Sequence, residues 1–141
     1  MVQTIRHAHA CNRASCRMNA ETLLLRQTHP QFAPGGQLTS QAFVPFPKDK
    51  GLLSVDDGDL INAADAFAFY TGALGLESCG VWAVTRAEAD GECAPAISTP
   101  ESDRPSHASL DFRGKSDKEC RRIAKKLKAW ALARGCQFAP A

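Results

Sequence analysis

The chain has 141 residues, of which 44% are hydrophobic and 23% charged, and these values are typical of one folded domain with a single core. The formal net charge of +2 gives little support to a protein that binds polyanions through its overall charge. No apolar run approaches the about 18 residues that a membrane-spanning helix needs, so the sequence predicts no membrane contact.

Charge is unevenly distributed along the chain. Residues 1–48 carry a net charge of +4, residues 49–103 carry −9 and residues 104–141 carry +7. Blocks of opposite sign either neutralise each other across the fold or face two different partners.

The N-terminal stretch differs in composition from the rest. We predict that residues 1–19 form a disordered basic tail and that residues 20–141 form a single domain. The tail lacks the apolar segment of a secretory signal, and its apolar residues are too sparse for a transit peptide. Met18 is an alternative translation start, which would make residues 1–17 dispensable. Without an export signal, the six cysteines are expected to be free thiols in the cytoplasm.

The tail also holds four residues of the kinds that bind Zn²⁺ or Cu⁺, namely His7, His9, Cys11 and Cys16. Their spacing lacks the paired Cys-x₂₋₄-Cys of structural zinc sites. We therefore expect no bound metal and no cofactor, and interpret these residues as an incidental feature of a tail.

Apolar runs predict the strands, and clusters of Gly, Pro and Asp predict the turns between them. The expected strands are 22–28, 38–44 at a sheet edge, 51–55, 80–85, 108–112 and a short one at 136–138. Residues 56–59 are expected to turn, and residues 86–91 to form one helical turn. Residues 92–106 are rich in Pro, Ser and acids, which predicts a mobile loop.

Two helices are expected. The first follows Asp59 or Asn62 as its cap and ends at Gly72 or Gly75. Its predicted core face, at helical spacing, is Leu60, Ala64, Phe67 and Ala68.

The second helix, residues 116–134, carries the clearest signals. Ser116 and Glu119 form a capping box, and Gly135 ends the helix. The predicted core stripe is Cys120, Ile123, Ala124, Leu127, Trp130 and Ala131, with Arg134 as its polar end.

These elements predict an α+β fold, in which a small mixed or antiparallel sheet of about five strands packs against two helices. A long segment with several prolines joins the strands at 22–28 and 51–55, and it contains Phe32, Phe43 and Phe46. A flexible linker rarely holds three phenylalanines, so we expect this segment to pack on the sheet and to hold polar groups at its rim.

The candidate catalytic residues are His29, His107 and Asp49. A histidine can act as general acid or base near neutral pH, and an aspartate can orient it. The candidate ligand-binding residues are Arg26, Ser40, Gln41 and Lys48, where arginine suits phosphate or carboxylate groups. No spacing rule forces them together, and capping by His29 with turn closure by Asp49 is the alternative.

The second predicted helix has a basic face. It contains Lys118, Arg121, Arg122, Lys125 and Lys126. Such a face binds nucleic-acid phosphates or an acidic partner, or it is simply solvated opposite the core stripe.

Four short motifs resemble those of a loose group of small bacterial proteins. They are His29-Pro30, Ser40-Gln41-Ala42-Phe43, Leu53-Ser54-Val55 and Pro105-Ser106-His107-Ala108. The resemblance covers most of the chain after Met18 and implies a bacterial cytosolic setting. The group carries no assigned activity, so the resemblance implies no catalytic role.

Two functional hypotheses follow, and the sequence does not decide whether the protein is an enzyme. The first is a small cytosolic accessory module that binds a protein or nucleic-acid partner, because the charge is segregated and the common nucleotide, hydrolase and redox motifs are absent. The alternative is a small enzyme acting on a phosphorylated or nucleotide substrate, with His29 and His107 in acid–base roles.

Overall fold

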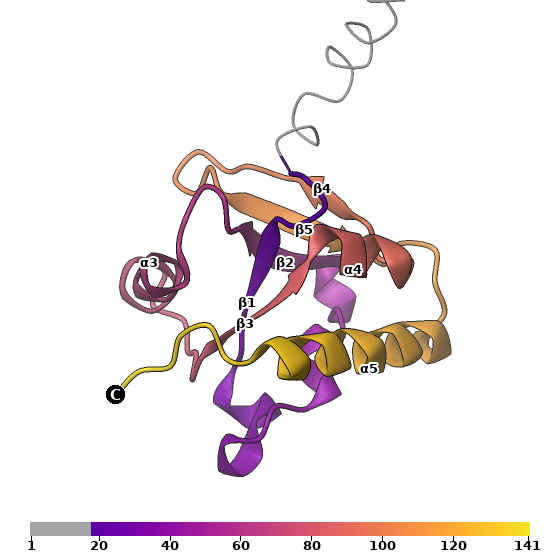
Figure 1. The fold of residues 1–141 in the computed structure, drawn as a ribbon, viewed down its shortest axis with the longest axis horizontal. Coiled ribbons are helices and arrows are strands. Elements are labelled where there is room, and N and C mark those ends of the chain that lie inside the picture. Colours follow the sequence, from indigo (N-terminus) through magenta and orange to yellow (C-terminus); the bar gives the residue numbers. More distant parts are fainter. Residues whose placement is uncertain (1–17) are drawn as a thin grey trace, which may run out of the picture.

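Five antiparallel strands form one sheet in the order β3-β1-β2-β5-β4 (Figure 1). The computed structural model describes residues 18–141, so most of the predicted tail, with His7, His9, Cys11 and Cys16, lies outside the described residues. The strands are β1 Leu23–Gln27, β2 Leu52–Asp57, β3 Val81–Thr85, β4 Ala96–Ser98 and β5 His107–Asp111. The predicted α+β class is confirmed, and the sheet is antiparallel throughout.

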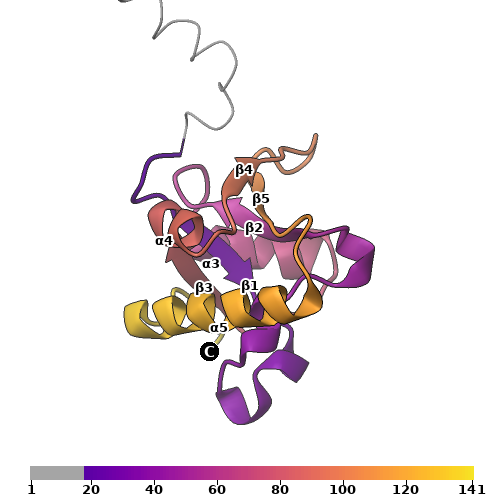
Figure 2. The same ribbon diagram turned by 90° about the vertical axis from the view of Figure 1, so that its right-hand side faces the viewer.

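Helices lie on both sides of this sheet (Figures 1 and 2). Helices α4 (Arg86–Gly91) and α5 (Asp117–Arg134) contact β3 on one side. Helix α3 (Ala63–Ala68), which continues into a π-helical turn η5 (Phe69–Ala73), contacts β1 on the other. None of the helices in residues 18–141 has the length and apolar character needed to cross a lipid bilayer.

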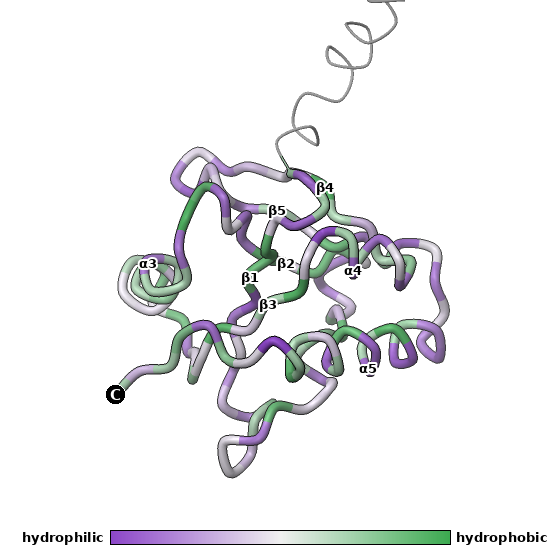
Figure 3. Tube along the Cα trace, in the orientation of Figure 1, coloured by the Kyte–Doolittle hydropathy of each residue, from purple (hydrophilic) through white to green (hydrophobic). Residues whose placement is uncertain are grey.

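The two sides of the sheet bury two separate cores. Neighbouring residues of a strand point to opposite faces, and accordingly Leu24 lies in the larger core beneath α5 while Leu25 lies in the smaller one beneath α3. Both are at most 2% exposed, as the run of leucines predicts. The most hydrophobic parts of the chain trace lie in these central strands (Figure 3). Met18 also belongs to the larger core.

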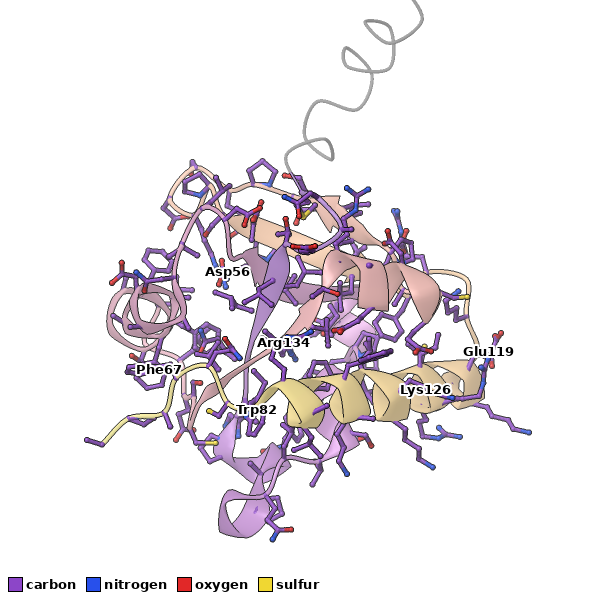
Figure 4. All side chains as sticks on the ribbon, viewed as in Figure 1. Asp56, Phe67, Trp82, Glu119, Lys126 and Arg134 are labelled. Carbon is purple, nitrogen blue, oxygen red and sulfur yellow. The ribbon has the colours of Figure 1, made fainter. Side chains whose placement is uncertain are left out.

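Helix α5 follows its prediction closely. The Ser116 hydroxyl accepts a hydrogen bond from the Glu119 amide at 3.2 Å, and the Glu119 carboxylate accepts one from the Ser116 amide at 2.9 Å. The predicted core stripe is buried except for Trp130, which is 43% exposed. Trp130 lies at the edge of the stripe and donates through Nε1 to Glu92 at 2.9 Å. Arg134, labelled in Figure 4, makes two hydrogen bonds to the Glu88 carboxylate, at 2.7 and 2.9 Å.

Of the predicted core face of the first helix, only Phe67 is confirmed, whereas Leu60, Ala64 and Ala68 are wrong. Asn62 caps the helix by accepting from the Asp65 amide at 2.8 Å. The buried side then contains Ala66 and the partly buried Phe67, whose ring lies 5.0 Å from that of Phe138, whereas Leu60 is 48% exposed and Ala64 and Ala68 are also exposed. The helix is short, so a small shift of its start rotates a different face toward the sheet.

The segment between β1 and β2 forms four 3₁₀ turns instead of an edge strand. They are η1 Pro30–Phe32, η2 Pro34–Gly36, η3 Ser40–Phe43 and η4 Pro47–Asp49. The strand predicted at 38–44 is therefore wrong. Ala42 and Phe43 are adjacent and both buried, which a half-buried strand does not allow, and η3 packs against α5. Phe32 is 8% exposed and Phe43 1%, as expected of an anchored segment, whereas Phe46 is 38% exposed.

Strand β4 lies within residues 92–106, where a mobile loop was expected. β4 pairs with β5 through Ala96, Ile97 and Ser98, and it brings Ala94 and Ala96 into the larger core. Small side chains carry little apolar signal, which explains why the sequence did not indicate this strand. The strand expected at 136–138 is reduced to one bridge between Val81 and Phe138. The turn expected at 56–59 is confirmed only from Gly58 onward, because β2 extends through Asp57; the Gly58 amide donates to the Leu23 carbonyl at 2.7 Å.

The packing of the 3₁₀ segment predicts different costs for two phenylalanines within it. Phe43→Ala should lower the free energy of unfolding by about 3–5 kcal/mol, because it empties a buried site beneath α5. Phe46→Ala, the matched control, should cost less than about 1.5 kcal/mol because its ring is partly in water. Denaturant unfolding of both variants measures the difference. Equal small losses would mean that the segment is not anchored to the core.

Candidate functional site

The site begins where β1 and β2 separate. These strands pair only at Leu24 with Asp57 and Leu25 with Asp56, and beyond this point they diverge. The Arg26 side chain fills the resulting gap. Its Nε donates to the Ala42 carbonyl at 2.7 Å and its Nη1 donates to the Ser54 carbonyl at 2.9 Å. The guanidinium thus satisfies one backbone oxygen of strand β2, at Ser54, and one of the turn η3, at Ala42.

Two adjoining hollows of about 190 and 260 Å³ open at this gap. Their walls come from the end of β1, from the residues around η4, and from η5 with the residues that follow it. Together they form one groove, which we call the Arg26 groove, and the residues that line both hollows are Arg26, Gln27, Phe46, Lys48, Tyr70 and Leu76.

Charges of both signs line the groove: the cations are Arg26, Lys48 and Arg104, and the carboxylates are Asp49 and Glu77. Arg26 and Lys48 form no ion pair with any carboxylate among residues 18–141. Burial lowers the pKa of the Arg26 guanidinium, electrostatic interactions with Tyr70 and Asp49 raise it, and the charge of Arg104 lowers it; the group stays charged at neutral pH. The Asp49 carboxylate accepts the Phe46 amide at 2.8 Å, so it closes the η4 turn as well as lining the groove.

His29 lies at one end of the groove. Its Nδ1 accepts from the Gln31 amide at 3.1 Å, which caps η1 and leaves the ring proton on Nε2. Nε2 lies 3.1 Å from the Glu77 carboxylate. His29 therefore has an assigned tautomer and a carboxylate partner, and it is partly open to solvent.

His107 is buried in the sheet and lines neither hollow, so the structure does not bring the two histidines into one groove. Its Nδ1 lies 2.9 Å from both the carbonyl oxygen and the hydroxyl of Thr99. A carbonyl oxygen only accepts, so Nδ1 carries the proton and Nε2 is left as an acceptor. Nε2 lies 3.1 Å from the Ser54 hydroxyl, and Ser54 is exposed and lines the groove.

The buried ion pair between Arg104 and Asp56 borders the hollow that Ser54 lines. Arg104 donates to both oxygens of Asp56, at 3.0 and 2.7 Å, and the Ser106 hydroxyl donates to Asp56 at 3.0 Å. Asp56 is 1% exposed and lies on the central strand β2, where Figure 4 labels it. Because Arg104 is committed to Asp56, its charge is largely neutralised.

The remaining predicted residues lie elsewhere. Ser40 begins η3, and Gln41 and Arg121 line a different cleft of about 600 Å³ beside the start of α5. All five basic residues of the predicted partner face are exposed on α5, and within residues 18–141 none of them forms an ion pair: they are Lys118, Arg121, Arg122, Lys125 and Lys126.

Sequence reasoning missed Ser54, Tyr70, Thr99 and Arg104. Ser54 had one usable signal, since a serine between buried Leu53 and Val55 must face the opposite side of its strand. The other three lie in turns and loops, and no periodic pattern marks them.

The groove can hold an anion on Arg26 and Lys48 beside a serine hydroxyl that is paired with a histidine. Comparisons with family models, with curated proteins and with solved structures found no match to this chain. The resemblance to small bacterial proteins stays a prediction. In the part of the chain that the structure describes, no three His, Cys, Asp or Glu side chains gather as a metal site.

The Asp56–Arg104 pair predicts a large and specific stability effect. Arg104→Gln should lower the free energy of unfolding by about 3–5 kcal/mol, because it leaves the Asp56 carboxylate buried without its partner. Adding Asp56→Asn should restore part of the loss. Arg113→Gln is the control, since Arg113 pairs with Asp111 at the surface and should contribute little. Similar unfolding midpoints for Arg104→Gln and Arg113→Gln would contradict this assignment.

Proposed function

We propose that the protein is a small enzyme whose substrate carries a phosphate or carboxylate group, and that the Arg26 groove binds this anion. Arg26 carries the proposal. Its charge is partly withdrawn from water, yet its protein partners are the neutral carbonyls of Ala42 and Ser54. The Asp49 carboxylate is near enough to act on the Arg26 charge but forms no ion pair with it, so an anionic ligand would supply a direct ionic partner.

Other groove residues suit the same ligand. Lys48 lines both hollows and adds a second positive charge. Phe46 and Leu76 supply apolar wall, while most of the other lining residues are polar or charged, which suits a small polar ligand. His107 reaches the groove through Ser54, and His29 closes its far end.

We also propose that the protein is cytosolic. Cys79, Cys93, Cys120 and Cys136 are free thiols, which suits a reducing compartment.

A second candidate function is nucleic-acid binding by the basic face of α5. The observation that favours it is the row of exposed cations on this helix without ion pairs among residues 18–141, including Lys118, Lys125 and Lys126. Their charges are available for phosphate contacts.

Anion binding in the groove is tested with inorganic phosphate and citrate as probes. At 100 times its dissociation constant, an anion should stabilise the native state by about 2.7 kcal/mol, which raises the melting temperature. Arg26→Met and Lys48→Ala should each reduce this rise, and the Lys48 variant removes only an exposed side chain. Lys126→Ala on α5 is the matched control and should respond like the wild type. A rise that is the same in all four proteins would locate the anion elsewhere.

Nucleic-acid binding by α5 is tested by fluorescence anisotropy with a labelled single-stranded oligonucleotide over a range of salt. The logarithm of the affinity should fall linearly with the logarithm of salt, by about 0.7 per phosphate contacted. The triple variant Lys118→Gln, Lys125→Gln and Lys126→Gln should flatten this slope by roughly 2. Affinity that is insensitive to salt, or absent, would remove this candidate.

A further inference from the structure

The geometry points to Ser54 as a nucleophile that His107 activates, so that the protein hydrolyses carboxylic esters whose acyl part carries an anionic group. This inference rests on the proposed function for the anionic group and adds the reacting atom. Its basis is one chain of contacts across the sheet, from the Thr99 carbonyl through the His107 ring to the exposed Ser54 hydroxyl.

Three parts of this arrangement are those that an activated serine needs. The nucleophile is within hydrogen-bond reach of its base, at 3.1 Å from Ser54 Oγ to His107 Nε2. The base is oriented from behind, at 2.9 Å from Nδ1 to the Thr99 carbonyl. The Thr99 hydroxyl is held in turn by Ser109 at 2.9 Å. The imidazole is therefore fixed in the tautomer that accepts the serine proton.

Exposure separates these residues into distinct roles. His107 is 9% exposed and Ser109 3%, whereas Ser54 is exposed and lines the groove. In the β2–β5 pair, Ser109 is directly opposite Ser54, and His107 is directly opposite Asp56. His107 therefore lies diagonally across from Ser54 on the same face of the sheet, within reach of its side chain. Only the hydroxyl end of the network meets a substrate.

Arg26 supplies the charge beside the reacting atom. Its Nη1 binds the carbonyl oxygen of Ser54 itself, so the guanidinium lies next to the backbone of the nucleophile. An oxyanion that forms on the substrate, or a carboxylate two or three bonds away from it, meets this group. A phosphate monoester would bring two negative charges to the reacting atom, and Arg104 is already committed to Asp56, which favours an acyl carbon as the site of attack.

The reaction balances as two transfers. The Ser54 oxygen forms a bond to the acyl carbon while its proton passes to His107 Nε2, and the alcohol leaves with that proton as the C–O bond breaks. Water then attacks the acyl-serine, His107 takes a proton from the water and returns it to the Ser54 oxygen, and the carboxylic acid is released. Such general-base assistance contributes about 10²–10⁴ in rate.

Covalent labelling tests the nucleophile directly. A fluorophosphonate probe should modify Ser54 in the full chain, as located by peptide mass spectrometry. Ser54→Ala should abolish the adduct, and His107→Gln should slow its formation by about 100-fold or more. Ser102→Ala, an exposed serine of the β4–β5 loop, should label like the wild type. No adduct on Ser54, or an adduct that forms equally fast in His107→Gln, would overturn the inference.

A second variant keeps the test independent of changes at the buried histidine. In Ser54→Cys the new thiol should be alkylated by iodoacetamide at pH 6 at least about tenfold faster than exposed Cys93 and Cys136, because an adjacent imidazole stabilises the thiolate. Alkylation at the rate of those two cysteines would show that His107 does not act on position 54.

Substrate charge separates this inference from the proposed anion site. Mono-p-nitrophenyl succinate and the neutral p-nitrophenyl butyrate have acyl chains of the same length. The anionic ester should be hydrolysed at least about tenfold faster, and Lys48→Ala should reduce that preference. Equal hydrolysis that still requires Ser54 would keep the nucleophile and remove the anion site. Hydrolysis of p-nitrophenyl phosphate in place of both esters would overturn the assignment of an acyl substrate.

Discussion

The placement of the Arg26 guanidinium between two diverging strands is the constraint on which the rest of the structure depends. An antiparallel sheet loses hydrogen bonds wherever its strands separate, and buried carbonyl groups without partners are costly. Arg26 donates to Ser54 across the gap and to Ala42 above it, so one side chain joins β1, β2 and η3. The same separation that removes strand pairing opens the groove, which means that the site and its main cation have one structural origin.

The 3₁₀ segment between β1 and β2 connects Arg26 and the groove to the core beneath α5. Ala42 and Phe43 lie against α5 on one side, and the Ala42 carbonyl holds Arg26 on the other. Four residues later the chain places Phe46 over the groove, where its ring lies 5.6 Å from that of Phe32. The packing of Ala42 and Phe43 against α5 therefore fixes the position of Phe46 in the groove wall, although α5 and the groove lie on different parts of the surface.

The sequence indicated most of the regular elements but missed β4 and the 3₁₀ turns, for physical reasons that differ. β1 and α5 were predicted because burial on both faces and a capping box leave strong local patterns, at Leu24 and Leu25 and at Ser116 and Glu119. η3 was mistaken for a strand, since the short apolar run Ala42, Phe43 and Val44 is as typical of a strand as of a packed turn. β4 was missed because its core residues are alanines.

Some residues of the candidate site could likewise be predicted from the sequence, and others could not. Arg26, His29, Lys48 and Asp49 were predicted together because they flank one segment, and the structure gathers them in one groove. The partner of His107 was not predictable from spacing, since Ser54 is 53 residues away and is brought near only by the pairing of β2 with β5. Long-range strand register leaves no local signal in a sequence.

The polar side of the sheet argues for a site more than for a solvated surface. A polar network buried in a protein is seldom more stable than apolar packing of the same shape, and the Asp56–Arg104 pair and the His107–Thr99–Ser109 contacts lie side by side on β2, β5 and the adjoining β4–β5 loop. Helix α3 covers the part of this face next to β1 with apolar residues. The part formed by β2 and β5 is polar instead of being covered in the same way. A network whose one exposed end is a serine hydroxyl beside the cations Arg26 and Lys48 has a chemical use that packing alone would not require.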